Sequence, residues 1–278
     1  MMNLFNEVSE ECSRATTLRY STSFSSAIKL LHNGLRPHIH NIYGFVRFAD
    51  EIVDTFHDYN KALLLGEFKR ETYLAIERKI SLNPILHSFQ LTVNQFKINL
   101  QLVEAFFKSM ELDLSNNKYD TGGYDEYIYG SAEVVGLMCL YVFCEGDAKQ
   151  YENLKLYARS LGAAFRKVNF LRDIKNDFEG LNRTYFPGCD FRNFTKADKT
   201  AIEKDIQKDF DHAYKGILQL PSKAKFGVYV AYKYYVSLFK KIKRLPPQNI
   251  LEERVRIPNY GKAFILAKAG LRSQFNIL

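Results

Sequence analysis

Two short rows of acidic side chains, far apart in the chain, are the feature of this sequence that could do chemistry. Asp50 and Asp54 are spaced i, i+4, and Asn169, Asp173 and Asp177 are spaced i, i+4, i+8. In a helix this spacing places side chains on nearly the same side, each about 6 Å above the last. Carboxylate and amide oxygens are ligands that Mg²⁺ prefers, together with water and substrate phosphates. The rows therefore predict a site for Mg²⁺ (or Mn²⁺) and a polyphosphate.

Either row alone is better explained as a solvated helix face, but the two together favour a functional site. The first row lies in the apolar stretch HIHNIYGFVRFADEIVDTF (38–56), where charge should be scarce. Two acidic rows on buried helices would repel each other strongly unless cations lay between them. Arg172 and Lys175 flank the second row and Arg183 follows it, which supplies positive charge for phosphate oxygens.

A hydroxyl-rich stretch, YSTSFS (20–25), precedes the first row. Its hydroxyl and backbone N–H groups could face an anion at a loop or helix start. A simple helix N-cap is an equally good interpretation of the same residues.

The composition is that of an ordinary globular protein. Of 278 residues 46% are hydrophobic and 25% are charged, and 15 glycines and seven prolines are few enough to suit long helices. The four cysteines lack zinc-type spacing and nothing implies disulfides, so a cytoplasmic protein is expected. No run of eighteen apolar residues predicts a membrane span, and the N-terminal stretch is too polar for a signal peptide.

The net charge of +8 points to anionic partners. We find no nucleic-acid-binding motif, and we expect no nucleic-acid partner. The basic run 240–244 is either a solvated helix end or a contact for an anionic membrane surface.

Apolar periodicity predicts helices through the whole chain. We expect them over 3–18, from Pro37 to the first acidic row, and over 61–80, 84–93, 98–115, 124–144, 147–180, from 195, from 222 to 245, and over 260–275. The segment 124–144 is nearly apolar on all sides and should be central, and Glu133 within it needs a partner or a metal. With no strand alternation and no linker, the chain is predicted to form one all-α domain over residues 1–278.

The order of these motifs resembles the squalene/phytoene synthase family of head-to-head prenyl transferases, and the layout is most similar to bacterial phytoene synthases. The resemblance covers nearly the whole chain. It rests on YSTSF (20–24), IYGFVRFADEIVD (42–54), YIYGSAEVVG (127–136), NFLRDIKNDFEGLNRTYFP (169–187) and, more weakly, the segments around Tyr235 and 253–255.

The resemblance implies an isoprenoid-synthase-type helical bundle around a central cavity. It implies that Asp50, Asp54, Asp173 and Asp177 hold Mg²⁺ ions that bridge two diphosphates, with help from Asn169. Residues implied to contact diphosphate or order the site are Ser21, Ser23, Tyr43, Arg47, Arg172, Arg183 and Tyr185. Aromatic faces for a carbocation would come from Phe24, Tyr43, Tyr127, Tyr129, Phe165 and Tyr235, for each of which ordinary core packing is the alternative.

The sequence departs from the family pattern at several positions. Tyr20 stands where the family often has His, and Ser131-Ala132-Glu133 stands where Val-Ala-Gly is common. Arg166 stands where Gln is common, and the spacing from Asp177 to Arg183 is one residue longer than usual. A reciprocal ion pair between Arg166 and Glu133 on facing helices would explain two of these departures.

The implied reaction joins two geranylgeranyl diphosphates into a cyclopropylcarbinyl diphosphate and rearranges it to phytoene, without a redox cofactor. The released diphosphate or a tyrosine hydroxyl would be the base. Formation of squalene or dehydrosqualene from farnesyl diphosphate is the close alternative, because tail length depends on cavity depth. That depth is expected to be set by Phe24, Ile28, Val135, Cys139 and Phe143.

Two alternatives belong to other classes of protein. A non-catalytic assembly or scaffold member would not need the metal ligands, all of which are present here. An all-α Mg²⁺-dependent nucleotide pyrophosphohydrolase would not need the nearly apolar helix 124–144. Because a hydrocarbon product must leave for a membrane, the basic segments 240–244 and 262–272 are expected to dock peripherally on the inner face of the membrane.

Overall fold

The computed structural model contains helices and no β-strand in the part of the chain that it describes. That part comprises residues 2–115, 121–175, 185–189, 194–252 and 255–258, together with 261, 265, 266, 268 and 269. The elements are α1 (Met2–Tyr20), α2 (Thr22–Ile28), α3 (Arg36–Asp54), α4 (Lys61–Arg78), α5 (Pro84–Phe96), α6 (Leu100–Ser115), α7 (Thr121–Ile128), the π-helical turn η1 (Tyr129–Glu133), α8 (Val134–Phe143), α9 (Ala148–Lys175), α10 (Lys196–Ile217), α11 (Ser222–Lys243) and α12 (Pro247–Glu252). The predicted all-α class is confirmed. Most of the predicted helix over 260–275 lies outside the described residues.

Several helices begin at residues whose side chains cap the first turn. The Asn60 side chain accepts a hydrogen bond from the backbone N–H of Leu63 at the start of α4, and Asn83 caps α5. A complete capping box between Thr195 and Asp198 opens α10. These caps satisfy backbone donors that the first helical turn leaves without partners.

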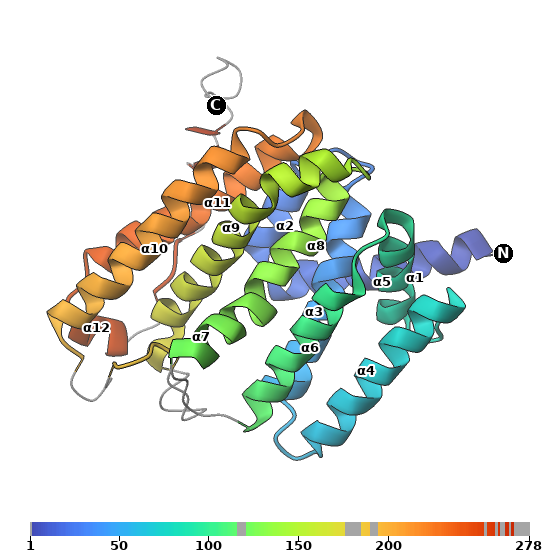
Figure 1. Ribbon diagram of the computed structural model, residues 1–278, viewed down its shortest axis with the longest axis horizontal. Coiled ribbons are helices and arrows are strands. Elements are labelled where there is room, and N and C mark those ends of the chain that lie inside the picture. Colours follow the sequence, from blue (N-terminus) through green and yellow to red (C-terminus); the bar gives the residue numbers. More distant parts are fainter. Residues whose placement is uncertain are drawn as a thin grey trace.

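The predicted central helix 124–144 is a continuous run of α7, η1 and α8 that passes through the middle of the bundle (Figure 1). Its α8 part packs against α3, α6 and α9, and its Val134, Leu137, Met138, Leu140 and Val142 are buried. The π turn at Tyr129–Glu133 carries one extra residue per turn, a distortion that is frequent at functional sites.

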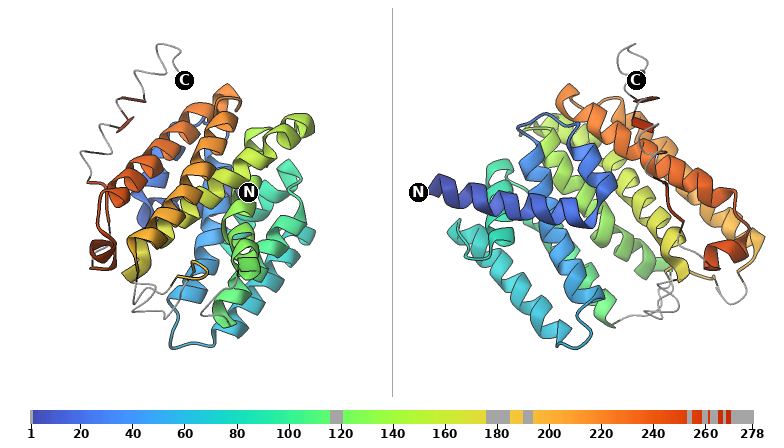
Figure 2. Two further views of the ribbon diagram at one scale, coloured as in Figure 1. Left: turned by 60° about the vertical axis from the view of Figure 1, so that its left-hand side comes forward. Right: turned by 180° about the vertical axis from the view of Figure 1, so that it is seen from behind.

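The helices pack on both sides of this run. Helices α10, α11 and α12 lie beyond α9 on one side, while α4 and α6 form the other flank (Figure 1). Helix α1 crosses α3 and α5, and its N-terminal end projects from the bundle (Figure 2). Buried apolar side chains from Ile28 to Ala269 form one connected cluster in the described part of the chain. That residues 1–278 form one domain stays a prediction.

Glycines let α9 approach η1 and α8 at backbone distance. A Cβ atom on Gly162 would lie 2.6 Å from the carbonyl oxygen of Ala132, and one on Gly136 would lie 2.9 Å from that of Ala158. Real Cβ atoms do not tolerate such contacts, so the packing of α9 against η1 and α8 requires glycine at both positions.

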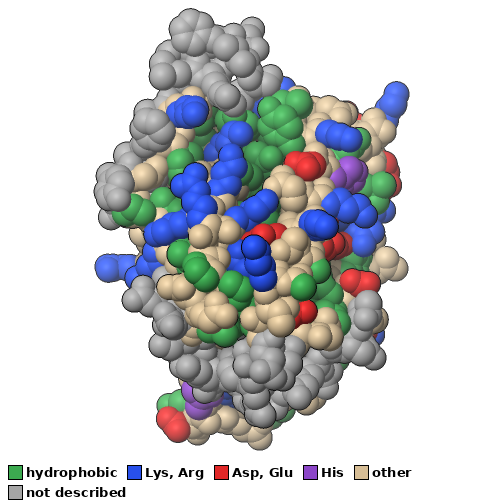
Figure 3. Space-filling view, turned by 90° about the vertical axis from the view of Figure 1, so that its left-hand side faces the viewer, with side chains coloured by type: hydrophobic (Ala, Val, Ile, Leu, Met, Phe, Trp, Pro, Cys, Tyr) green, Lys and Arg blue, Asp and Glu red, His purple; other side chains and the backbone are tan. Residues whose placement is uncertain are grey.

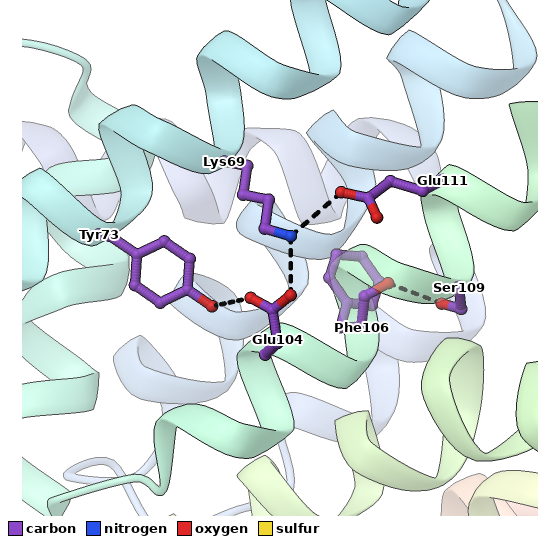
Figure 4. A network of polar contacts seen from close by, with 6 residues as sticks. All are labelled: Lys69, Tyr73, Glu104, Phe106, Ser109 and Glu111. Carbon is purple, nitrogen blue, oxygen red and sulfur yellow. Dashed lines mark hydrogen bonds and ion pairs between the residues drawn. The ribbon is translucent and has the colours of Figure 1, made fainter.

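A surface network ties α4 to α6 on the far flank (Figure 4). Lys69 Nζ lies 2.8 Å from Glu104 Oε1 and 3.1 Å from Glu111 Oε1, and the Tyr73 hydroxyl donates to Glu104 at 2.7 Å. The glutamates are half exposed, so each pair contributes less than about 1 kcal/mol.

No helix in the described part is long and apolar enough to cross a membrane. Lysine and arginine side chains gather beside hydrophobic ones on the face that lies at the left of Figure 1 (Figure 3). The predicted basic run 240–244 ends α11 with Lys240, Lys241, Lys243 and Arg244 exposed and Ile242 buried. Its docking on anionic lipid stays a prediction, and most of 262–272 lies outside the described residues.

Candidate functional site

A cavity of about 280 Å³ lies between α2, α3, η1, α8, α9, α10 and α11. Most of its wall is aliphatic or glycine. The polar side chains that line it are Tyr43, Asp50, Ser131, Tyr157, Arg166, Asn169 and Tyr235. A chamber with an apolar wall and a few polar groups suits a ligand with a long apolar part and a charged end.

Helices α3 and α9 carry the two acidic rows, and their C-terminal ends lie on the same side of the molecule (Figure 1). Asp50 of the first row and Asn169 of the second both line the cavity. Asp54 and Asp173 are half-buried one turn further along and are not part of the lining. Asp177, Arg183 and the side chain of Lys175 lie outside the described residues.

The Asp50 carboxyl sits deep in the protein, and the surface it retains faces the cavity. Burial raises its pKa from 3.8 to about 7, with Arg166 acting against that rise and Asp54 adding to it. A carboxyl in this position is partly protonated at neutral pH. A cation beside it would favour the charged form.

Two of the arginines that we expect to bind diphosphate already form ion pairs with carboxylates. Arg47 Nη2 pairs with Glu51, and its guanidinium also lies 4.3 Å from the centre of the Tyr20 ring. Arg172 donates two hydrogen bonds to Asp173, of 3.0 and 2.5 Å. Diphosphate binding through these arginines requires an exchange of partners.

Asn169 supplies an acceptor atom that suits a metal ion. Its Oδ1 is buried and has no hydrogen-bond partner in the described part of the chain. The oxygen atoms of Asn169, Asp50, Asp54 and Asp173 are all hard donors, the kind that Mg²⁺ prefers. The described residues, which leave out Asp177, contain no group of three His, Cys, Asp or Glu side chains able to hold a metal.

An aromatic row lines the cavity beside these polar groups. The ring centre of Phe24 lies 5.9 Å from that of Tyr43 and 6.4 Å from that of Phe165, and Phe165 stacks on Tyr235 at 3.8 Å. These rings come from α2, α3, α9 and α11. Burial raises the pKa of Tyr43 to about 12 and also raises that of Tyr235, so both hydroxyls stay protonated at neutral pH.

Other aromatic candidates lie outside the lining. Tyr127 is fully buried and stacks with Phe170 and Tyr185 at 6.0 and 5.4 Å. Tyr129 lies beneath Arg159, whose guanidinium is 5.2 Å from the ring centre. Arg166 lines the cavity, whereas Tyr127 and Tyr185 pack behind Arg166 and do not line the cavity.

The hydroxyl-rich stretch starts a helix. The Ser21 side chain caps α2 by accepting from the backbone N–H of Phe24 at 3.2 Å, as the N-cap interpretation predicts. Ser21 also lies beside the Tyr43 hydroxyl, and Ser23 is half-buried in the first turn. Whether these hydroxyls also meet diphosphate stays a prediction.

The predicted ion pair between Arg166 and Glu133 is wrong. Glu133 Oε2 lies 2.5 Å from Nε of Arg159, while Arg166 Nη2 donates to the Tyr127 hydroxyl at 2.5 Å. Arg159 is half exposed and keeps much of its hydration in that pair, whereas Arg166 is half-buried with its Nε fully buried and needs partners inside the protein. It finds them in Tyr127 and in the negative charges of Asp50 and Asp113.

Asp113 is a neighbour of the site that the sequence reasoning missed. It lies on α6, is 5% exposed, and accepts a hydrogen bond of 2.7 Å from Tyr127. It stands where polar and apolar residues alternate in the predicted helix 98–115, two positions after Glu111, so the sequence alone does not distinguish it from a solvated residue on a helix face.

Known proteins resemble this chain in sequence and in fold. It is 27% identical over 197 residues to the 4,4'-diapophytoene synthase of Staphylococcus haemolyticus, covering 68% of this chain and 66% of that protein, just under two thirds. It is 26% identical over 300 aligned positions to the 15-cis-phytoene synthase of Synechococcus elongatus, covering 96% of this chain and 94% of that protein.

Among solved structures, a dehydrosqualene synthase crystallised with a ligand matches with a TM-score of 0.82 at 18% identity. The match covers 97% of this chain and 98% of that one, and shows the isoprenoid-synthase-type helical fold. The family model for squalene/phytoene synthases matches residues 17–261, and the chain therefore belongs to the squalene/phytoene synthase family.

Proposed function

We propose that the protein condenses two geranylgeranyl diphosphates head to head, through a cyclopropylcarbinyl diphosphate, to phytoene in carotenoid biosynthesis. Members of the family are prenyl transferases that catalyse head-to-head condensation. The observation that carries the proposal is the cavity, whose apolar and aromatic wall ends in Asp50, Arg166 and Asn169. A prenyl tail fits the wall and a diphosphate fits the polar end.

The choice of geranylgeranyl substrate rests on similarity over nearly the full length to a phytoene synthase. The residues expected to set tail length, Phe24, Ile28, Val135, Cys139 and Phe143, all line the cavity. A second candidate is the formation of squalene or dehydrosqualene from farnesyl diphosphate. It is favoured by the similarity to a diapophytoene synthase and by the fold match to a dehydrosqualene synthase.

The metal ligands in this proposal are Asp50, Asp54, Asn169, Asp173 and Asp177. When bound there, Mg²⁺ (or Mn²⁺) supplies positive charge that stabilises the leaving diphosphate. Among the described ligands, the Asn169 oxygen without a partner gives the strongest support. Arg47 and Arg172 would exchange Glu51 and Asp173 for diphosphate oxygens, which arginine binds in bidentate fashion.

The aromatic row would receive the carbocation that remains once diphosphate leaves. Ring faces carry negative quadrupole, and those of Phe24, Tyr43, Phe165 and Tyr235 lie along one cavity whose wall is mostly apolar. Because the pKa of Tyr43 is raised to about 12, its hydroxyl is a poor base at neutral pH. The released diphosphate is therefore the favoured base for the last proton, and no redox cofactor is required.

Incubation with Mg²⁺ and either geranylgeranyl or farnesyl diphosphate, with and without NADPH, tests the proposal through analysis of the hydrocarbon products. We expect phytoene from the geranylgeranyl substrate without NADPH, and none from Asp50→Ala or Asp173→Ala. Asp58→Ala, which removes an exposed carboxylate just beyond α3, is the matched control and should keep full activity. Product from the farnesyl substrate alone would favour the second candidate, and no product from either would contradict both.

A further inference from the structure

Arg166 is the one cationic side chain among the described residues that line the cavity. Its Nη2 donates to the Tyr127 hydroxyl at 2.5 Å, and its guanidinium lies 5.0 Å from the ring centre of Phe170 and 5.4 Å from that of Tyr127. Its Nε is buried and has no hydrogen-bond partner in the described part of the chain. Donor capacity is therefore left over on a side chain that faces the cavity.

The surroundings hold this guanidinium in place. The Tyr127 hydroxyl that accepts from Arg166 donates in turn to Asp113 Oδ2 at 2.7 Å, which links α9 to α7 and α6. Phe170, which lies under the guanidinium, stacks on Tyr185 with ring centres 3.9 Å apart. A charged group fixed in this way needs no rearrangement before it meets a ligand.

The position of Arg166 sets what its charge can do. It precedes Asn169 by three residues on α9, so it lies one helical turn inside the polar end of the cavity, and Asp50 is among its nearest negative charges. Arg47 forms an ion pair with Glu51, and Arg172 forms one with Asp173. Arg166 has no ion pair of that kind in the described part of the chain.

We propose that Arg166 is a diphosphate-binding residue that makes the site take up the divalent cation together with diphosphate rather than alone. A fixed positive charge beside Asp50 repels a lone divalent cation and attracts an anion, because both interactions follow the sign of the charges. This inference rests on the proposed metal and diphosphate site. It adds a residue and an order of binding to that site.

A purely structural role for Arg166 predicts something different. If the side chain only satisfied Tyr127 and Asp113, its loss would loosen the wall and weaken the binding of cation and anion together. The proposed role predicts changes of opposite sign. The two binding constants, measured separately, therefore separate the two roles.

The experiment measures binding without turnover. Mn²⁺ binding to the metal-free protein is followed by the loss of the free-ion electron paramagnetic resonance signal. Binding of inorganic pyrophosphate is followed by calorimetry in EDTA. Relative to wild type, we expect Arg166→Gln to bind Mn²⁺ about fivefold more tightly and pyrophosphate at least about fivefold more weakly. Arg166→Lys keeps the charge and should hold both constants near the wild-type values.

Arg159→Gln is the matched control, since it removes the same charge from the same helix outside the cavity lining. It should leave both constants unchanged. Weaker binding of both ligands by Arg166→Gln, or no change in either, would overturn the proposal. If that variant fails to fold, the wild-type protein provides the test. The proposal would also be overturned if the wild type did not bind pyrophosphate in EDTA. Failure of the proposed function is seen separately, as absence of hydrocarbon product from the wild-type enzyme.

Discussion

Replacement of Asp50 by Asn should stabilise the metal-free protein while it abolishes the proposed activity. The unfolded carboxyl ionises with the ordinary pKa of 3.8, and burial raises the folded value to about 7. Below pH 3.8 the carboxyl is protonated in both the folded and the unfolded state, so it does not lower the free energy of unfolding. As pH rises from 3.8 to about 7 only the unfolded state ionises, and stability falls. Above pH 7 the carboxyl is ionised in both states, and the full decrease in the free energy of unfolding remains.

The interval between the two pKa values corresponds to about 4 kcal/mol at pH 8, because each pKa unit is worth about 1.4 kcal/mol. Asn resembles the protonated carboxyl in shape and carries no charge. Asp50→Asn should therefore raise the free energy of unfolding at pH 8 by about 2 to 4 kcal/mol. At pH 5.5 the gain should shrink to about 2 kcal/mol or less, because the folded wild type is then protonated.

Urea denaturation in EDTA at pH 5.5 and pH 8, followed by circular dichroism, measures these differences. Asp58→Asn is the control, since that carboxylate is exposed and should change stability little at either pH. An Asp50→Asn protein that is no more stable than wild type at pH 8 would refute the argument. It would mean that Asp50 is better solvated or better paired than its place in the cavity indicates.

Two further substitutions test the packing around the site by chemical denaturation. Gly162→Ala should destabilise the fold by about 2 kcal/mol, because its Cβ would lie 2.6 Å from the Ala132 carbonyl oxygen, whereas Gly66→Ala meets nothing within 4 Å and should gain up to about 1 kcal/mol. Equal effects at the two glycines would contradict the close approach of α9 and η1. Tyr127→Phe should cost about 1 to 3 kcal/mol, because it removes the hydroxyl between Arg166 and Asp113, and unchanged stability would show that water replaces it readily.

The helices could be predicted from the sequence because their signals are local. Asn60, Asn83 and the Thr195–Asp198 capping box act within one turn of the residues they cap, so the printed sequence contains the whole interaction. The apolar character of 124–144 likewise indicated a central helix from composition alone. Burial of Asp50 followed from its apolar neighbours in the same way.

Which side chains pair between facing helices could not be predicted. Such pairing depends on how each helix is rotated about its axis and how deeply each side chain is buried. The backbone of Glu133 lies level with Gly162, so Arg159 and Arg166 are each about one turn away along α9. The π turn at Tyr129–Glu133 changes the angular position of every later residue, which an α-helical count does not include. Asp113 was missed for a related reason, since its partner Tyr127 comes from another helix.

If the proposed function holds, the glycine contacts of α9 with η1 and α8 also constrain how product size can diverge during evolution or directed selection. On that wall the cavity meets Gly136 and Gly162, where no smaller residue exists and a larger one would force the helices apart. Side chains elsewhere on the wall, such as Ile28 on α2 and Ile217 on α10, can be shortened by single substitutions. Variants that accept longer tails should therefore collect mutations on α2 and α10, while the glycine wall is inherited unchanged.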